Sequence, residues 1–392
     1  MADPQATPRP VRRDAPVLIV GAGPAGLATA AMLQRNGIAA HILEAGSGVG
    51  NSWSHYYAAL RLHTGRRISG LPGYPLPGGY PLFVPRAAFV HYLRAYARHF
   101  NLRITPHQRV IRATHTAGHW RVETADTIWE APVLVAASGI YSKPYTPPLP
   151  GLADYGGRLL HSAAYHTAAP FAGLDVLVVG LGNSGAEIAR DLATAARSVT
   201  VAVRSGITIV PRLTAGIPTS YLAVVLSHLP APWIAAIRRL TARRLQHTLG
   251  ALGLPVGPAD SFPVIGLELL DLIRAGQVQV APGLAHCTTD GVCFTDGTCR
   301  PFDALILATG YRPALDYLAA TIQPPDQKKT RLQIRDAPAP NLYLVGFWYD
   351  SLLGTLYVIG RQAGAVAAAI VHSRAARLPD SWFTPLTPAD EA

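Results

Sequence analysis

Two stretches of the chain carry the same glycine spacing. Residues 17–28 read VLIVGAGPAGLA and residues 176–187 read VLVVGLGNSGAE, and in both a G-x-G-x-x-G follows four apolar residues. The first glycine of this motif makes a tight turn, the second lets the backbone approach a pyrophosphate, and the third lets the helix pack closely on the strand. Free amides and a partial positive charge at the helix start attract the phosphates. We therefore predict two dinucleotide sites. Their glycines are Gly21, Gly23, Gly26, Gly180, Gly182 and Gly185.

The residue that ends the strand after each motif distinguishes the two sites. Glu44 follows Gly26 by 18 residues, where a carboxylate can accept both ribose hydroxyls of an unphosphorylated adenosine. The corresponding strand of the second copy, SVTVAVRS, ends in Arg204 and Ser205. A guanidinium binds a 2′-phosphate through two parallel hydrogen bonds, whereas a carboxylate repels it. The first site therefore suits FAD or NAD and the second suits NADPH. The alternative for Arg204 is a solvated strand-end charge, with Arg212 as the next candidate for the phosphate contact.

The flanking sequence supplies the strand, turn and helix that each motif needs. VLIV at 17–20 is a continuous apolar run, typical of a buried parallel strand. A helix is expected over 25–36, stopped by Gly37. Further on, RAAFVHYLRAYARHF predicts a helix, residues 107–130 alternate like hairpin strands, and VLVAAS predicts another buried strand. SKPYTPPLPG, at 142–151, is typical of a domain linker.

These elements predict an α/β fold with two three-layer, Rossmann-like dinucleotide-binding domains built on parallel sheets. The FAD domain is expected to be discontinuous, over 16–147 and 277–392. The NADPH domain is expected over 148–276, with a helical insertion at about 216–250. Residues 1–15, which are rich in charge and proline, are expected to be a disordered leader.

Composition excludes several classes of protein. Hydrophobic residues make up 49% of the chain and charged residues 15%, which is enough for large buried cores. The net charge of +11 includes no dense basic run, so nucleic acid is not an expected partner. Cys287, Cys293 and Cys299 form no CxxC pair, so neither a redox disulfide nor a metal site is expected. The chain has no signal-peptide pattern and no run of about 18 apolar residues, which predicts a cytoplasmic protein without an integral membrane segment. Peripheral membrane contact by 221–237 stays an alternative to core packing.

Further segments resemble the flavin-containing monooxygenases. YGGRLLHSAAY, residues 155–165, is similar to the family's fingerprint F-x-G-x-x-x-H-x-x-x-(F/Y). Gly157, His161 and Tyr165 are in place, and Tyr155 replaces the Phe. EAGSGVGNSWSHYYAALRLHT, GLGNSGAEIA, ILATGYRP and LYLVGFWYDSLLG are similar to other family segments. The resemblance covers about residues 16–372, and within the family it points to the short YUCCA-type indole-pyruvate monooxygenases.

The resemblance implies an FAD- and NADPH-dependent monooxygenase. NADPH would reduce FAD, and the reduced flavin would form a C4a-hydroperoxide with O2 that passes one oxygen atom to a small organic substrate. The step would be N- or S-oxygenation, or a Baeyer–Villiger-like decarboxylation of a 2-oxo acid. The catalytic candidates are His63 and Thr64 near the flavin, Asn183 at the nicotinamide nucleotide, and His161 and Tyr165, which would position the NADPH domain. The other implied cofactor contacts are Pro24, Ala25, Trp53, Leu62, Val110, Gly139, Ser184, Thr309, Gly310 and Tyr311.

The chain also departs from the family. Many members carry an Asn beside the reactive flavin ring, where this chain reads His63, Thr64, Gly65 and Arg66. Two alternatives to an oxygenase remain. A flavin disulfide reductase shares the twofold architecture but needs a redox CxxC, and a non-catalytic flavoprotein would bind the cofactors without oxygen uptake.

Overall fold

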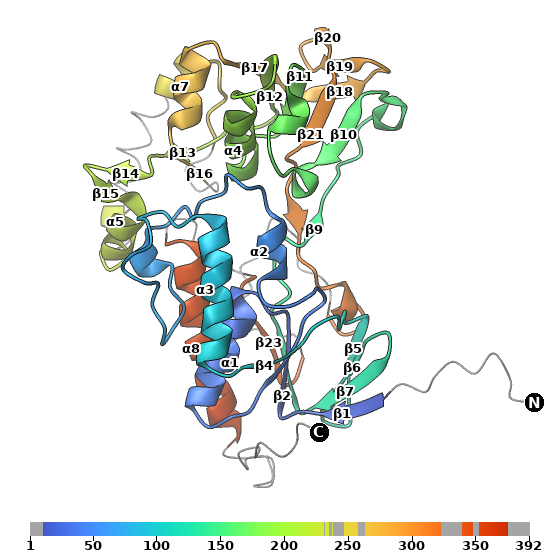
Figure 1. Cartoon of the computed structure of the whole chain (residues 1–392), viewed down its shortest axis with the longest axis vertical. Helices are drawn as coiled ribbons and strands as arrows, with labels where there is room; N and C mark the ends of the chain where they lie inside the picture. Colours follow the sequence, from blue (N-terminus) through green and yellow to red (C-terminus); the bar gives the residue numbers. More distant parts are fainter. Residues whose placement is uncertain are drawn as a thin grey trace, which may run out of the picture.

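The computed structural model describes residues 11–230, 232–234, 237, 247–257, 263–322, 339–347 and 353–374. The chain forms two lobes, each built around a five-stranded parallel sheet (Figure 1). The first lobe, at the bottom of Figure 1, carries the first glycine motif, and the second lobe carries the other. The predicted α/β fold with two Rossmann-like domains is confirmed.

The sheet of the first lobe has the strand order β23-β8-β2-β3-β4. Its strands are Leu342–Leu344, Val133–Ala136, Val17–Val20, His41–Leu43 and Arg103–Thr105. Ile19 packs toward the helices α1 (Pro24–Arg35), α3 (Arg86–His99) and α8 (Thr355–Arg374). Leu18 packs toward the opposite layer. Because both faces are covered, β2 is apolar at every position, as its sequence predicts.

The opposite layer is the sheet β1-β7-β6-β5, with strands Val11–Asp14, Thr127–Ala131, His119–Glu123 and Arg112–Thr116. The last three confirm the alternating strands expected over 107–130. β1 pairs in parallel with β7, so residues 11–14 of the expected leader form a strand. An edge strand needs only backbone hydrogen bonds, which composition does not reveal. Residues 1–10 lie outside the described residues.

The sheet of the second lobe has the order β10-β21-β11-β12-β17. Its strands are Arg158–His161, Ala304–Leu307, Asp175–Val179, Ser198–Val203 and Val278–Pro282. Helices α4 (Asn183–Leu192) and α7 (Glu268–Arg274) lie on one face. The antiparallel strands β18 (Leu284–Cys287), β19 (Gly291–Phe294) and β20 (Cys299–Pro301) form a small sheet on the other.

This sheet corrects the expected domain boundary at 276. β17 pairs with β12, and β21 lies between β10 and β11, so the second lobe continues to about residue 312. Between β17 and β21 the chain forms the β18–β20 sheet, which packs on the same lobe. The apolar run of β21 fits a buried strand of either sheet, which is why sequence alone assigned it to the wrong lobe.

The chain crosses between the lobes twice, and the two crossings are paired. β9 (Lys143–Pro144), within the predicted linker, is antiparallel to β22 (Tyr311–Arg312), midway between the lobes in Figure 1. Lys143 also forms an ion pair of 2.6 Å with Asp316. The lobes are therefore joined by a two-stranded hinge.

Short elements complete the second lobe. They are β13 (Ile209–Val210) with β16 (Val264–Ile265), β14 (Leu213–Thr214) with β15 (Ile217–Pro218), and α5 (Thr219–Leu226). α5 and helical residues at 232–234, 237 and 247–251 fall in the expected insertion, of which residues 231, 235–236 and 238–246 lie outside the described residues. Within the described residues, no helix has both the length and the apolar character needed to cross a membrane.

Candidate functional site

The first glycine motif forms a cradle in front of α1, in which each glycine has a separate role. Gly21 has a φ of +108°, and a Cβ there would lie 2.6 Å from the Ala137 carbonyl oxygen. A Cβ on Gly26 would lie 1.9 Å from the Gly21 oxygen. A Cβ on Gly23 would meet no atom within 4 Å. Two glycines therefore allow close packing, and the third leaves open space at the helix N-terminus, which fits an approaching phosphate.

The second motif repeats this geometry in front of α4. A Cβ on Gly180, which has a φ of +98°, would lie 2.8 Å from the Ala308 oxygen. A Cβ on Gly185 would lie 2.1 Å from the Gly180 oxygen, and Gly182 again faces open space. The structure thus holds two matched cradles, one in each lobe, and both fit a dinucleotide pyrophosphate.

The carboxylate of Glu44 is built into the first cradle. It is buried; its Oε2 accepts a hydrogen bond of 2.7 Å from the Ala22 amide, and its Oε1 accepts one of 2.8 Å from the Gly46 amide. A carboxylate offers about four acceptor positions, so each oxygen keeps capacity for a ribose hydroxyl. The arrangement fits the role predicted from sequence.

The two arginine candidates for the 2′-phosphate have different surroundings. Arg204 follows β12 and is exposed, and within the described part of the chain its guanidinium has no hydrogen-bond or ion-pair partner. The side chain of Arg212 is only 12% exposed, and its Nη2 lies 3.0 Å from Oε1 of Glu187. The structure therefore leaves Arg204 free to bind an anion and engages Arg212 elsewhere.

His161 of the fingerprint forms a hydrogen bond to the chain segment that crosses between the lobes at Gly310. Its Nδ1 accepts from the Ala163 amide at 3.1 Å, so Nε2 carries the proton and donates to the Gly310 carbonyl at 3.0 Å. Burial lowers the pKa of His161, against the opposing effect of the Gly310 hydrogen bond, so the ring is neutral near pH 7. The ring also packs against Tyr311 at 5.1 Å, and Thr309 donates to the carbonyl of Tyr145 at 2.6 Å.

The two fingerprint tyrosines are hydrogen-bonded inside the second lobe. The Tyr165 hydroxyl donates to Asp191 of α4 at 2.7 Å, and its ring is buried. The Tyr155 hydroxyl donates to the Phe302 carbonyl at 2.7 Å. His161 and Tyr165 thus have the contacts expected of positioning residues, and their effect on catalysis stays a prediction.

His63 and Thr64 lie where the two lobes meet. His63 Nε2 is 3.1 Å from Oε1 of Glu187, a buried carboxylate on α4 that sequence reasoning missed. The Thr64 hydroxyl is 2.7 Å from that of Ser69. A Cβ on Gly354 would lie 2.3 Å from Cγ2 of Thr64, so this segment also touches the residue before α8. The only available signal for Glu187 was an acidic residue within the apolar pattern of the helix.

Asn183 is held by the backbone of its own lobe. Its side-chain oxygen accepts from the Ile265 amide at 2.8 Å, and its side-chain nitrogen donates to the Pro263 carbonyl at 3.1 Å. These two hydrogen bonds connect the start of α4 to the segment 263–265. Its catalytic role stays an untested prediction.

The other predicted contacts are distributed around the cradles. Pro24 and Ala25 begin α1, and Ser184 lies in the first turn of α4. Trp53, on α2 (Asn51–His55), packs edge-on against Phe89, with 4.6 Å between the ring centroids. Leu62 is buried. Val110 is partly buried against the core between the two sheets of the first lobe, and Gly139 follows β8 with a φ of +84°.

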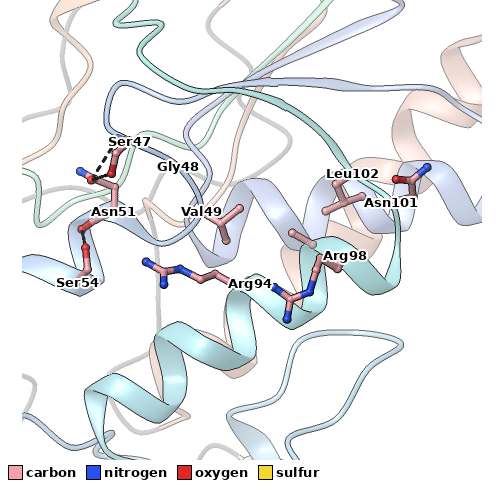
Figure 2. A pocket seen from close by; sticks show the side chains of 10 residues that line it. Ser47, Gly48, Val49, Asn51, Ser54, Arg94, Arg98, Asn101 and Leu102 are labelled. Atoms are coloured by element: carbon pink, nitrogen blue, oxygen red, sulfur yellow. Dashed lines mark hydrogen bonds between the residues drawn. The ribbon is translucent and has the colours of Figure 1, made fainter. Parts of the chain in front are cut away.

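A cavity of about 410 Å³ lies between the loop at 47–51 and α3 (Figure 2). Arg94 and Arg98 of α3 and Ser47 and Asn51 of the facing segment are among its lining residues. None of the motif glycines lines this cavity. Its loop nevertheless adjoins the first cradle, because the Gly50 amide donates to the Ala22 carbonyl at 3.0 Å.

Comparisons with known proteins agree with this geometry. The chain is 34% identical to the indole-3-pyruvate monooxygenase YUCCA1 of Oryza sativa subsp. japonica over 359 residues, which covers 86% of this chain and 88% of that protein. It is 33% identical over 365 residues to the probable indole-3-pyruvate monooxygenase YUCCA4 of Arabidopsis thaliana, covering 87% of each.

The chain belongs to the YUCCA-type flavin monooxygenases.

Solved structures of flavin-containing and cyclohexanone monooxygenases share the fold of this chain. A flavin-containing monooxygenase from Stenotrophomonas maltophilia superposes with a TM-score of 0.74 at 27% identity, over 92% of this chain and 99% of that one. A cyclohexanone monooxygenase, 16% identical over 93% of this chain and 88% of that one, has a TM-score of 0.70 and shares the fold. This YUCCA-type protein is thus an enzyme, a monooxygenase of the FAD- and NADPH-dependent type.

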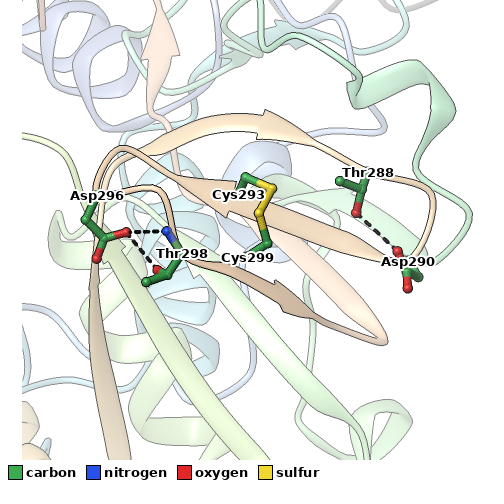
Figure 3. Close-up of a disulfide and its surroundings, with 6 residues drawn as sticks. All are labelled: Thr288, Asp290, Cys293, Asp296, Thr298 and Cys299. Atoms are coloured by element: carbon green, nitrogen blue, oxygen red, sulfur yellow. Dashed lines mark hydrogen bonds between the residues drawn. A yellow bond between two sulfur atoms is a disulfide. The ribbon is translucent and has the colours of Figure 1, made fainter.

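The cysteines argue against the disulfide-reductase alternative. The model of the pyridine nucleotide-disulphide oxidoreductase family matches residues 18–211, which contain no cysteine. The structure pairs Cys293 with Cys299, six residues apart, in a disulfide that joins β19 to β20 (Figure 3) and that was not expected from the sequence. These strands carry neither cradle. The flavin monooxygenase assignment therefore stands without a redox cysteine pair at the nucleotide sites.

Proposed function

We propose that this YUCCA-type enzyme uses NADPH and O2 to convert a 2-oxo acid into the carboxylic acid one carbon shorter. The reaction consumes one 2-oxo acid, one O2, one NADPH and one proton, and it yields the shorter acid, CO2, NADP⁺ and water. The observation that carries the proposal is the pair of matched cradles in a chain one-third identical to indole-3-pyruvate monooxygenases. Nothing in the proposal requires a metal or a nucleophilic triad, because the flavin supplies the difficult chemistry.

The residues of each cradle assign the cofactors. The first cradle, with Gly23 open and Glu44 at the ribose position, would hold FAD. The second, with Gly182 open and Arg204 and Ser205 after β12, would hold NADPH. When bound, the flavin supplies hydride acceptance and oxygen activation. The protein must then bring the two cofactors together and keep water away from the reacting atoms.

The meeting surface of the lobes is built to exclude water. Tyr57 and Tyr165 are buried there. α5 covers the segment after Thr64, because the Gly65 amide donates to the Ser220 hydroxyl at 3.2 Å and the Arg67 amide donates to the Tyr221 hydroxyl at 3.1 Å. Arg66 and Arg67 follow in this segment. Arg66 donates to the Tyr80 carbonyl, and Arg67 is exposed, so its guanidinium would attract a substrate carboxylate.

The substrate class is tested by product analysis. Purified enzyme, NADPH and ¹⁸O₂ are incubated separately with aromatic 2-oxo acids, amines and thioethers. We expect only the 2-oxo acids to give products, with one ¹⁸O in the shorter acid and one CO2 per substrate consumed. N- or S-oxides would contradict the 2-oxo acid assignment and keep the monooxygenase. Absence of NADPH-dependent oxygen uptake with every substrate would contradict the proposed activity.

The purified protein is expected to be yellow and to hold about one FAD per chain, since the first cradle provides one site. Flavin released by denaturation is quantified by absorbance and separated chromatographically to distinguish FAD from FMN. A protein that releases no flavin, and binds none when FAD is added, would contradict this assignment.

The fingerprint residues should affect coupling more than cofactor content. His161→Ala removes the hydrogen bond to the Gly310 carbonyl, and Tyr165→Phe removes a half-buried hydrogen bond worth about 1 kcal/mol. We expect both variants to retain FAD but to release more H2O2 per NADPH consumed. A looser crossing at His161, or looser packing of the meeting surface at Tyr165, would admit water. A peroxide assay run beside NADPH oxidation measures this. Tyr155→Phe removes a comparable hydroxyl and restores the family's Phe, so its coupling should match that of the wild type. Wild-type coupling in all three variants would make the fingerprint purely structural.

A further inference from the structure

A buried carboxylate joins the two lobes and is not used by the proposed function. Glu187, on α4 of the second lobe, is 4% exposed. Its Oε2 accepts from the Tyr57 hydroxyl at 2.6 Å, and its Oε1 lies 3.1 Å from His63 Nε2. Tyr57 and His63 belong to the first lobe. Arg212 of the second lobe donates to the same Oε1 at 3.0 Å.

The charge of Glu187 depends on partners from both lobes. Burial raises its pKa, but the hydrogen bonds from His63 and Tyr57 and the charge of Arg212 outweigh that effect and lower the pKa to about 2. The carboxylate is therefore ionised. An ionised group without partners is costly in a buried position, so separating the lobes would leave it poorly compensated. The cluster consequently favours one relative placement of the lobes.

This placement matters for catalysis because Glu187 and its partner His63 lie on segments that belong to different predicted cofactor sites. Glu187 follows Gly182 by five residues on the helix that begins at the second cradle. His63 precedes Thr64, which touches Gly354 at the start of α8. The hydrogen bond between Glu187 and His63 thus links the helix of the NADPH cradle to the segment expected beside the flavin.

We propose that Glu187 is a positioning residue that docks the helix of the NADPH cradle onto the Tyr57–His63 segment and so sets the approach of nicotinamide to flavin. The second half of this inference rests on the proposed cofactor assignment. The first half, docking, concerns only the protein.

The docking is tested by hydrogen–deuterium exchange of Glu187→Gln without added nucleotide. We expect faster exchange in peptides covering both 56–66 and 183–192, although these segments lie in different lobes. The matched control is Asp175→Asn, which also replaces a carboxylate bonded to an arginine, Arg197, but within the second lobe alone. Its effect should not reach 56–66. Unchanged exchange at 56–66 in Glu187→Gln would overturn the docking.

The positioning is tested by anaerobic reduction of the flavin, followed by absorbance. In Glu187→Gln, the rate at saturating NADPH should fall at least about tenfold, while the dissociation constant for NADPH changes by less than about threefold, because the cradle is intact. A normal saturated rate together with faster exchange would reduce Glu187 to a stabilising residue and overturn the proposal.

A milder variant protects the test against misfolding. Tyr57→Phe keeps the carboxylate and removes only one donor, so it should give the same pattern at smaller size. If it changes neither exchange at 56–66 nor the saturated rate, the proposal fails. If the protein holds no flavin, the cofactor assignment fails, and the exchange measurement still decides the docking.

Discussion

Gly182→Ala should leave the fold intact and raise the KM for NADPH at least about tenfold, a loss of about 1.4 kcal/mol in binding. Gly182 has φ −91° and ψ −170°, which alanine adopts without strain, and its Cβ would meet no protein atom within 4 Å. The methyl group would instead occupy the space that the pyrophosphate needs. Thermal unfolding without nucleotide and steady-state kinetics with varied NADPH measure the two effects.

Two further substitutions make this prediction specific. Gly185→Ala would place a Cβ 2.1 Å from the Gly180 oxygen, so it should lower the unfolding temperature itself. Gly23→Ala, at the open position of the first cradle, should keep the fold and lose FAD instead. A Gly182→Ala enzyme with unchanged KM would show that the pyrophosphate does not approach the backbone there.

Arg204→Ala should reduce the preference for NADPH over NADH at least about tenfold, because a charge-assisted hydrogen bond contributes about 1.5–3 kcal/mol. The side chain is exposed at the end of β12, and within the described residues no other group competes for it. The ratio of kcat/KM for the two nucleotides measures the preference. The loss should come from NADPH alone, since NADH has no 2′-phosphate.

Arg103→Ala is the matched control for charge. It removes one exposed positive charge at the start of β4 in the first lobe, away from the second cradle. The nucleotide preference should stay at the wild-type value. An unchanged preference in Arg204→Ala would place the phosphate contact elsewhere, and Arg212 is a poor substitute because Glu187 holds it.

The sequence by itself determined the features that depend on the local backbone. A glycine that must turn, lie open or pack against a carbonyl does so within one strand–turn–helix unit, so the spacing of Gly21, Gly23 and Gly26 already contained the geometry of the cradle. The same holds for Glu44, which ends the next strand and returns to the Ala22 amide. The buried strands were also readable, because burial on both faces requires a continuous apolar run.

The tertiary structure decided which distant groups meet. Tyr57 and His63 lie 130 and 124 residues from Glu187 in sequence, and no local pattern marks such a pair. The C-terminal boundary of the second lobe likewise depends on β21. Its apolar residues would suit either sheet, and its pairing with β10 and β11 places it in the second lobe. Local propensity determines that a strand or helix forms, whereas a buried charge or a free sheet edge is satisfied only by the partner that folding brings to it.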